Sequence, residues 1–164
     1  GAFDIFLIYG FLGAPVKWVM KAGIGKIPFV GAACKAAGFI FVDNSSPKAA
    51  ARSVLEAERI LHKGASIAIF PEGARSETGK LARFKKGAFQ MAADQHLQVV
   101  PITLNGPFHV LPIGSLNLHR HPMEMVIHAP ITLPDEGVGT PKGLQSIADE
   151  TKRIISEDLW EEFK

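Results

Sequence analysis

The apolar residues of this chain alternate between two kinds of pattern over most of its length. Short, nearly continuous apolar runs are typical of buried strands, and they occupy residues 16–20, 39–42, 66–70, 98–104 and 123–128. Between them, apolar residues recur at helical spacing in residues 28–37, 47–62, 86–96 and 143–163. Strands that alternate with helices in this way predict an α/β fold with a mostly parallel central sheet flanked by helices.

The helix predicted at residues 47–62 has the clearest ends. Asn44-Ser45-Ser46-Pro47 supplies capping side chains followed by a proline, and Gly64 is a typical helix end. The apolar positions of this stretch are Ala50, Val54, Ala57 and Leu61, and the charged ones are Arg52, Glu56, Arg59 and Lys63. We expect the apolar set to face the sheet and the charged set to face solvent.

Composition limits the classes of protein that this chain can belong to. It has 164 residues, 47% of them hydrophobic, which is enough for a single domain, residues 1–164, with its own core. The one cysteine, Cys34, excludes a disulfide scaffold, and no Cys/His cluster predicts a metal site. No apolar run reaches the ~20 residues that span a bilayer. Asp4 stands where a signal peptide would be basic. We therefore predict a chain that is soluble or peripheral to a membrane.

The net charge of +2 conceals two halves of opposite sign. Residues 1–86 hold thirteen Lys and Arg against six Asp and Glu, whereas residues 87–164 hold five against ten. A basic half indicates an anionic partner, which would be a phosphate, a nucleic acid or an acidic membrane surface. The alternative is a solvated surface with no partner.

Candidate chemistry is concentrated in residues 70–87, which begin where a predicted strand ends. Open α/β sheets bind their ligands at such strand ends. Gly73 and Gly79 permit close approach of the backbone to an anion, and a helix N-terminus follows. Five cations lie within this stretch: Arg75, Lys80, Arg83, Lys85 and Lys86. The pattern predicts a phosphate site, the alternative being a glycine-rich surface turn with solvated lysines. A nucleotide-binding P-loop is excluded, because its glycine spacing and its Ser/Thr are absent.

Four blocks of the sequence resemble, in order and spacing, those of a known enzyme family. The most specific is FPEGARS (residues 70–76) with the continuation GxLxxFKKGAF (79–89), which looks like the family's FPEGTRS block. The others are KAGIGKIPFVG (21–31), GFIFVD (38–43) and VPI (100–102). The family is that of the lysophosphatidic acid acyltransferases, the 1-acylglycerol-3-phosphate acyltransferases of glycerolipid synthesis. The resemblance covers roughly residues 3–106.

Two departures from the family pattern are visible. Asp4 aligns with the aspartate of the family's catalytic His-x4-Asp block, so the histidine is expected before Gly1, outside this chain. Among the histidines of the chain, only His119 has a carboxylate five residues on, at Glu124, but it lies far downstream of the other blocks on a predicted turn. These histidines are therefore expected to be surface or packing residues. The family usually has Arg where this chain has Asn44, which leaves the acceptor open unless Lys48 or Arg52 compensates.

The resemblance implies fatty acyl transfer from acyl-CoA or acyl carrier protein to the hydroxyl of lysophosphatidate, with no metal or bound cofactor. It assigns Asp4 as the carboxylate that orients the catalytic histidine. It assigns substrate binding to Lys21, Glu72, Gly73, Arg75, Ser76, Lys85 and Lys86. Asp4 has an alternative role as the cap of a helix, and Lys21 has one as a solvated lysine.

The acyl chain implies a membrane partner. The N-terminal segment is rich in large apolar residues, namely Phe3, Phe6, Leu7, Tyr9, Phe11, Leu12 and Trp18. It is predicted either to lie at the membrane surface, on the cytoplasmic face, or to form an ordinary core helix. The rival functions are acyl transfer to another acceptor, such as a lysophospholipid, an ornithine lipid or a glycan, and non-catalytic binding of a lipid or phosphoanion. Nucleic acid is not expected as a partner, because aromatic residues do not interleave with the cations.

Overall fold

A computed structural model describes residues 2–43, 45–112, 115, 117–134 and 137–164. The chain divides into two compact units. One unit consists of Ala14–Phe70, and the other combines Gly1–Gly13 with Pro71–Lys164. Each unit is described by itself, and the prediction of a single acyltransferase domain stays a prediction.

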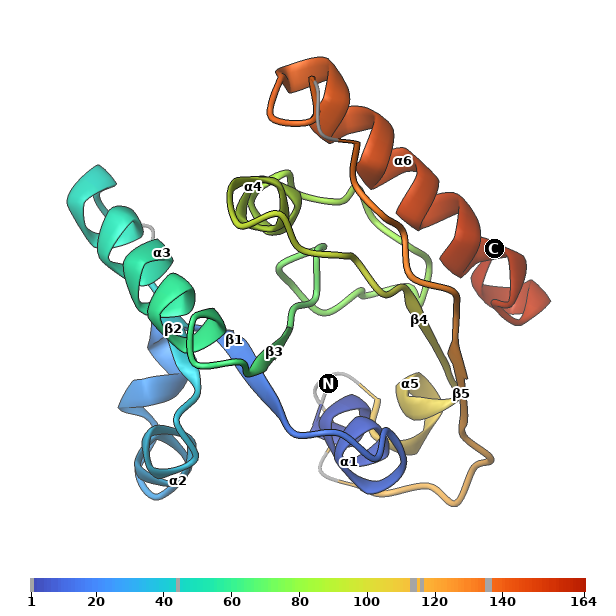
Figure 1. Ribbon diagram of the computed structural model, residues 1–164. Coiled ribbons are helices and arrows are strands. Elements are labelled where there is room, and N and C mark those ends of the chain that lie inside the picture. Colours follow the sequence, from blue (N-terminus) through green and yellow to red (C-terminus); the bar gives the residue numbers. More distant parts are fainter. Residues whose placement is uncertain (1, 44, 113–114, 116, 135–136) are drawn as a thin grey trace. The chain divides into compact units, whose positions relative to one another are not determined.

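The Ala14–Phe70 unit is built on a three-stranded parallel sheet with the strand order β2-β1-β3 (Figure 1). The strands are β1 (Val16–Lys21), β2 (Ile40–Val42) and β3 (Ser66–Ala68), with Val19 paired to Ile40 and Val16 to Ser66. The chain passes from β1 to β2 through a 3₁₀ turn, η1 (Ala22–Lys26), and a short helix, α2 (Val30–Ala36). Helix α3 (Pro47–Leu61) leads from β2 to β3. This parallel sheet with its helices confirms the predicted α/β class.

Helix α3 begins where the capping residues predict, but it packs through a different face than its apolar pattern predicts. The Ser46 hydroxyl accepts a hydrogen bond from the amide of Ala49 at 3.2 Å, as an N-cap should. Val54 is exposed, whereas Ser53 and Ala57 are buried. Ser53 takes the inner position because its hydroxyl donates to the carbonyl of Ala49 and accepts from the amide of Asp43 at the end of β2.

Trp18 forms the centre of the core in this unit. Its side chain is 1% exposed, and its ring stacks on that of Phe70 with centroids 5.2 Å apart. Val16 and Ile40 are buried beside it in the sheet. Trp18 is therefore a core residue, and its proposed place in a membrane-facing aromatic segment was wrong, because β1 is the central strand of this sheet.

The second unit contains an antiparallel pair of strands and four α-helices among its described residues. Strands β4 (Ile102–Asn105) and β5 (Glu124–Ile127) pair from Ile102 opposite Ile127 to Asn105 opposite Glu124. The helices are α1 (Ala2–Phe11), α4 (Gly87–Asp94), α5 (Pro107–Val110) and α6 (Pro141–Glu157), and a 3₁₀ turn, η2 (Glu161–Phe163), closes the chain. The predicted strand at residues 98–104 begins later than expected, preceded by an isolated bridge from Val99 to Ile131.

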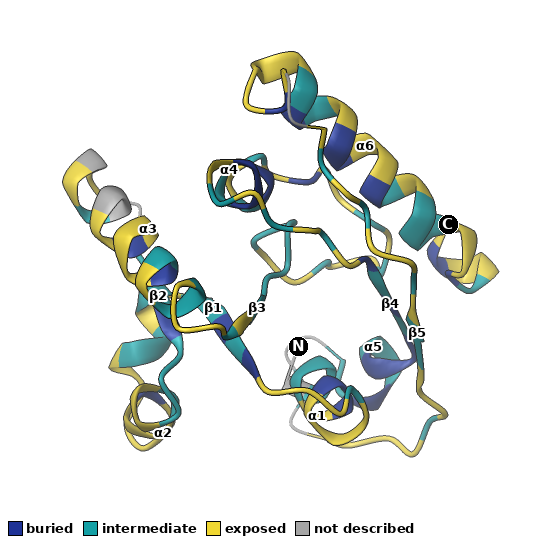
Figure 2. Cartoon of the chain, viewed as in Figure 1, coloured by how far each residue is buried: buried dark blue, intermediate teal, exposed yellow. Residues whose placement is uncertain are grey.

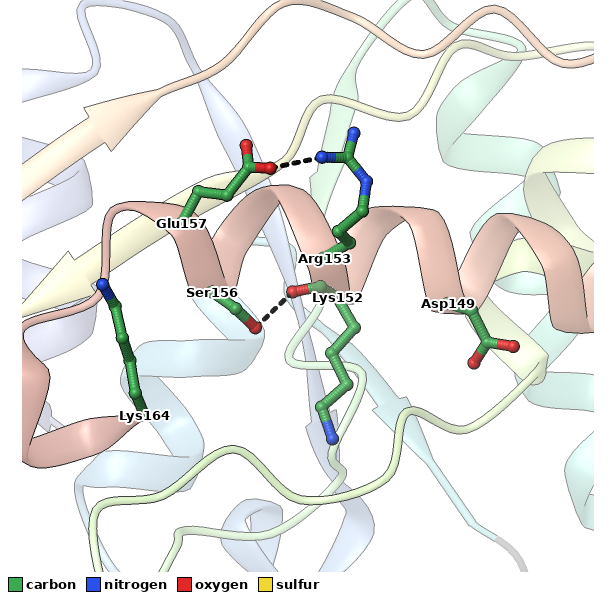
Figure 3. A pocket seen from close by; sticks show the side chains of 6 residues that line it. All are labelled: Asp149, Lys152, Arg153, Ser156, Glu157 and Lys164. Carbon is green, nitrogen blue, oxygen red and sulfur yellow. Dashed lines mark hydrogen bonds and ion pairs between the residues drawn. The ribbon is translucent and has the colours of Figure 1, made fainter.

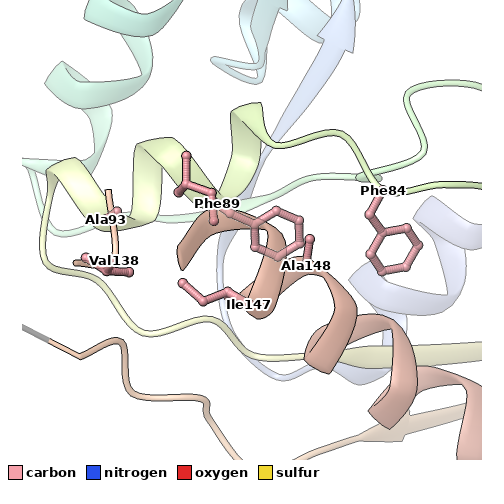
Figure 4. Close-up of a cluster of buried hydrophobic side chains, with 7 residues drawn as sticks. Phe84, Phe89, Ala93, Val138, Ile147 and Ala148 are labelled. Carbon is pink, nitrogen blue, oxygen red and sulfur yellow. The ribbon is translucent and has the colours of Figure 1, made fainter. Parts of the chain in front are cut away.

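The core of this unit lies between α4 and α6 (Figure 4). Its buried residues are Phe84, Phe89, Ala93, Val138, Leu144, Ile147 and Ala148. Thr140 caps α6 by accepting a hydrogen bond from the amide of Gly143 at 3.1 Å. Phe84 belongs to the FKKG stretch, so the predicted anion-binding segment is attached directly to this core.

Helix α1 has one buried and one exposed face. Leu7 and Ile8 are buried, whereas Phe6, Tyr9 and Phe11 are exposed by 45–74% (Figure 2). This helix is therefore neither an ordinary core helix nor a wholly exposed segment. No helix among the described residues is long and apolar enough to cross a membrane.

Candidate anion-binding site

Residues 71–86 form a loop that closes on itself through two hydrogen bonds. The amide of Lys85 donates to the carbonyl of Pro71 at 2.8 Å, and the amide of Ala82 donates to a carboxylate oxygen of Glu72, also at 2.8 Å. Glu72 thus links the start of the loop to Ala82, ten residues further along. Its carboxylate is a structural brace that fixes where the residues between Gly73 and Leu81 lie.

Gly73 and Lys85 lie against each other inside this loop. Gly73 has φ +71°, and a Cβ there would lie 2.7 Å from the Nζ of Lys85. A larger residue would therefore both strain the backbone and displace the ammonium group. The glycine brings a cation directly onto the FPEG turn, and the role of these residues in substrate binding stays a prediction.

Arg75 and Ser76 are tied to other parts of the same unit. A guanidinium nitrogen of Arg75 donates to the carbonyl of Leu111, and the side chain is exposed. The hydroxyl of Ser76 donates to the carbonyl of Lys80 at 2.8 Å, which keeps the middle of the loop compact. Arg75 is thus positioned and still able to bind an anion, whereas Ser76 has a local structural role.

Lys86 points away from Lys85 although the two are adjacent in sequence. Its Nζ donates to the carbonyl of Pro141, at the first residue of α6, at 2.9 Å. Of the five cations predicted to form a cluster, Lys85 and Lys86 therefore contact different parts of the unit. Lys85 lies on the FPEG turn, and Lys86 links the loop to α6.

The remaining predicted residues, Asp4 and Lys21, come from the first part of the family-like region. Asp4 is half-buried in the first turn of α1, where a carboxylate is favoured by the helix dipole, and it interacts with its surroundings. Asp4 lies inside the helix and does not precede it. It is therefore an acidic residue of the first turn and not the N-cap that was the alternative prediction. Lys21 is the exposed last residue of β1 and belongs to the Ala14–Phe70 unit.

A pocket on the outer face of α6 was not predicted and does not have the character of a substrate site (Figure 3). It is lined by Asp149, Lys152, Arg153, Ser156, Glu157 and Lys164. Arg153 is paired with Glu150 at 2.7 Å and with Glu157. The hydrogen bond from Arg153 lowers the pKa of Glu150 below its usual range. These charges neutralise one another along the exposed side of the helix.

A smaller pocket lies where β2 meets α3, close to the position at which the family usually has Arg. Its lining includes Arg52, Asp43 and Glu56. Hydrogen bonds from Ser45 lower the pKa of Asp43, and the nearby charge of Lys26 acts in the same direction. Glu56 is also paired with Arg59 at 2.7 Å, so the two carboxylates of this pocket lie among cations and give it no clear preference for an anion. Asn44 itself lies outside the described residues.

Two histidines of the second unit contact carboxylates. His109 contacts Glu162 at 3.1 Å, and His128 contacts Asp158 at 3.6 Å and the Thr103 hydroxyl at 2.8 Å. His119 is exposed.

Glu124 takes part in a hydrogen-bond network around the buried Asn105 that sequence reasoning missed. One of its carboxylate oxygens accepts from the Asn105 amide at 2.9 Å and from the Trp160 indole at 3.0 Å. The partners lie 19 to 55 residues apart along the chain, so no local pattern indicates the network.

Comparison with known proteins adds three findings. The family model described as Acyltransferase matches residues 1–105. The chain is 39% identical over 129 residues to the chloroplastic 1-acyl-sn-glycerol-3-phosphate acyltransferase LPAT1 of Arabidopsis thaliana, a match covering 78% of this chain and 36% of that protein. It is 28% identical over 159 residues to the 1-acyl-sn-glycerol-3-phosphate acyltransferase of Pseudomonas aeruginosa, covering 96% of this chain and 60% of that protein.

A solved structure is also similar. The crystal structure of the 1-acyl-sn-glycerophosphate acyltransferase PlsC from Thermotoga maritima matches with a TM-score of 0.73 and 29% identity, over 94% of this chain and 61% of that one. The chain spans 36% and 43% of the length of the first two curated relatives, from Arabidopsis thaliana and Brassica napus.

Proposed function

Since the chain belongs to the Acyltransferase family, we propose that it transfers a fatty acyl group from a thioester donor, acyl-CoA or acyl carrier protein, to the hydroxyl of lysophosphatidate. The observation that carries this proposal is the loop of residues 71–86, because it sets Lys85 against Gly73 and positions the exposed guanidinium of Arg75. The acceptor carries a phosphate, and Arg and Lys are the side chains that bind phosphate. The relatives from Arabidopsis thaliana and Pseudomonas aeruginosa are named for this substrate.

The proposed chemistry is a single acyl transfer. The acceptor hydroxyl attacks the thioester carbonyl, a C–O bond forms and the C–S bond breaks. The hydroxyl proton passes to a base and then to the leaving thiolate. Asp4 is proposed to hold the ring of that base, the histidine expected five positions before it, in the correct tautomer. Arg75 and Lys85 are proposed to bind the acceptor or donor phosphates, and Lys86 is proposed to support the loop. Lys21, in the other unit, is proposed by the family resemblance alone to contribute to substrate binding.

The direct test is to mix the full-length protein with lysophosphatidate and a long-chain acyl-CoA. We expect free thiol and phosphatidate in equal amounts. Liposome binding without either product would contradict acyl transfer and support the rival function, a non-catalytic lipid- or phosphoanion-binding module. Repeating the assay with acyl carrier protein as donor distinguishes the two thioesters. The membrane location on the cytoplasmic face remains part of this proposal.

A second acceptor class is favoured by the pocket between β2 and α3. Asp43 and Glu56 line it, and because Glu56 is paired with Arg59 at 2.7 Å, the carboxylate of Asp43 is the group that we propose would bind an amine. Such a pocket suits an amine, as in a lysophospholipid with an amino headgroup or an ornithine lipid. A panel that compares these acceptors with lysophosphatidate separates the two possibilities. A higher kcat/KM for the amino acceptors would replace lysophosphatidate as the substrate.

Replacing Arg75 with Ala is expected to raise the KM for lysophosphatidate about 10- to 100-fold, the equivalent of one charge-assisted hydrogen bond. The effect on kcat should be smaller, because the phosphate is bound in both the ground state and the transition state. Arg83→Ala is the matched control, since Arg83 is an exposed cation of the same loop. Equal effects of the two variants would mean that only the net charge of the loop matters.

Gly73→Ala should weaken acceptor binding through Lys85. The new Cβ would lie only 2.7 Å from the Lys85 Nζ and displace it, and the positive φ adds a strain of about 1–2 kcal/mol. Gly64→Ala is the control, because Gly64 has φ +80° and no heavy atom within 4 Å of an added Cβ. Thermal unfolding should show a similar loss of stability in both variants, whereas only Gly73→Ala should raise the KM. An unchanged KM would remove Lys85 from the site.

A further inference from the structure

The segment between η1 and α2 exposes a cluster of apolar side chains. Ile27 is 49% exposed, Phe29 is 90% exposed and Val30 is 48% exposed. Among the described residues, Phe29 is the most exposed of the large hydrophobic side chains. Figure 2 shows this approach to α2 as exposed. We call residues 27–30 the apolar tip. A cluster of this kind on a protein surface marks an interaction site far more often than isolated exposed side chains do.

The apolar tip is held in place by its backbone. Phe29 has φ +61°, a conformation that is costly for a bulky side chain and persists only where the surrounding structure enforces it. The amide of Gly31 donates to the carbonyl of Ile27 at 2.8 Å, and the amide of Ala33 donates to the carbonyl of Phe29 at 2.9 Å. In this backbone conformation the side chain of Phe29 lies on the surface and is 90% exposed.

The turn beneath the tip is closely packed. A Cβ on Gly31 would lie 2.3 Å from the carbonyl oxygen of Gly25, so the start of α2 lies directly on η1. This close approach leaves the tip little freedom to fold its apolar side chains back against the protein. The exposure of Phe29 is a property of the fold and not of a loose loop.

The charges around the tip are almost all positive. Residues 14–43 contain four lysines and a single carboxylate, Asp43. Lys21, Lys26 and Lys35 are exposed, whereas Lys17 donates to the carbonyl of Ala37 at 2.6 Å. Lys26 ends η1, immediately before the tip. Basic side chains beside an exposed apolar cluster fit a surface with negative headgroups above an apolar interior.

We propose that the apolar tip inserts into the headgroup region of an anionic lipid bilayer, with Phe29 as its anchor and Lys26 and Lys35 paired with the headgroups. The proposal deepens the function proposed above, since a membrane is where a lipid acceptor resides. It does not depend on turnover, because binding to a bilayer is measured without a substrate.

The first test measures partition of the full-length protein onto vesicles of phosphatidylglycerol and phosphatidylcholine in equal parts. Phe29→Ser should weaken partition about tenfold or more, because it removes the anchor from the apolar phase. Leu55→Ser is the matched control, since Leu55 is a 64% exposed apolar residue of α3 in the same unit. Lys26→Ser should weaken binding to these vesicles and leave binding to pure phosphatidylcholine unchanged. Equal partition of Phe29→Ser and Leu55→Ser would overturn the proposal.

A second measurement applies even where other segments of the full-length protein also bind lipid. In Phe29→Trp, vesicles with brominated acyl chains should quench the added fluorescence, whereas the added fluorescence of Leu55→Trp should stay unquenched. Vesicle-bound protein whose introduced indole is not quenched would overturn the proposal. So would self-association that depends on Phe29 without lipid, because the tip would then be an interface between copies of this chain.

Activity assays distinguish failure of this proposal from failure of the proposed function. Phe29→Ser should keep its turnover of a short-chain, water-soluble acceptor and lose turnover of an acceptor presented in vesicles. Absence of turnover in the unsubstituted protein, with quenching in Phe29→Trp, would leave the docking surface standing and reject the enzyme function. Equal loss on both acceptors would place Phe29 in the fold or the site and overturn its role as an anchor.

Discussion

Asp4→Asn is expected to lower kcat by about a thousandfold or more, the size of effect seen when the carboxylate of a catalytic triad becomes an amide. The amide neither stabilises an imidazolium nor enforces the tautomer in which the histidine accepts the hydroxyl proton. The KM for lysophosphatidate should change little, because Asp4 lies on α1 and not on the basic loop. Thiol release under saturating acceptor measures kcat directly.

The control for this variant is Asp94→Asn. Asp94 is an exposed carboxylate of α4 in the same unit, and it accepts a hydrogen bond from Gln90 that an asparagine oxygen can also accept. Stability provides the second readout, because removing a first-turn acid from α1 should cost at most about 1 kcal/mol. A variant with normal kcat and only this small loss of stability would show that Asp4 serves the helix and not the reaction.

Asn105→Leu is expected to lower the free energy of unfolding by about 2–4 kcal/mol, the cost of leaving several buried partners unsatisfied. Asn105 is 0% exposed. Its amide nitrogen donates to Glu124 at 2.9 Å and to the carbonyl of Asp158 at 2.8 Å, and its oxygen accepts from the amide of Trp160 at 3.0 Å. The residue therefore ties β4 to β5 and to the chain that follows α6. Urea unfolding measures the loss.

Asn117→Leu serves as the control, because Asn117 is exposed and should change stability by less than about 0.5 kcal/mol. A third variant, Asn105→Asp, tests the network by pH. The introduced carboxyl lies beside Glu124 and is buried, so its pKa in the folded state is raised above its unfolded value. The deficit relative to the unsubstituted protein should therefore grow as pH rises through that raised pKa. A deficit independent of pH would contradict the geometry around Asn105.

Local signals in the sequence predicted most of the helices and strands. Ser46 and Thr140 cap their helices because a short hydroxyl side chain satisfies free amides wherever a helix begins. The inner face of α3 was harder to predict, because Ser53 is buried by hydrogen bonds to residues of β2 and α3 that periodicity does not reveal. Strand β3 ends at Ala68, two residues before the end of its apolar run, although its partner β1 continues to Lys21.

The candidate site was predictable only as a segment. The glycines and cations of residues 71–86 mark an anion loop, but adjacent lysines behave differently in the structure: Lys85 lies against Gly73, whereas Lys86 reaches Pro141. These partners lie 12 and 55 residues away in sequence, so the distinction depends on tertiary structure. For the same reason the sequence does not reveal that the carboxylate of Glu72, predicted to bind substrate, accepts a hydrogen bond from the amide of Ala82 within the loop.

Phe84 has a consequence for how the anion loop moves. Its ring is buried among side chains of α4 and α6, while the residues on either side of it, Arg83 and Lys85, are exposed (Figure 4). The loop is therefore anchored close to its C-terminal end in the core of its unit. Because packed interiors yield little, the end of the loop that carries Lys85 cannot move far without disturbing that core. A substitution that loosens the packing around Phe84 should therefore also loosen the position of Lys85 against Gly73.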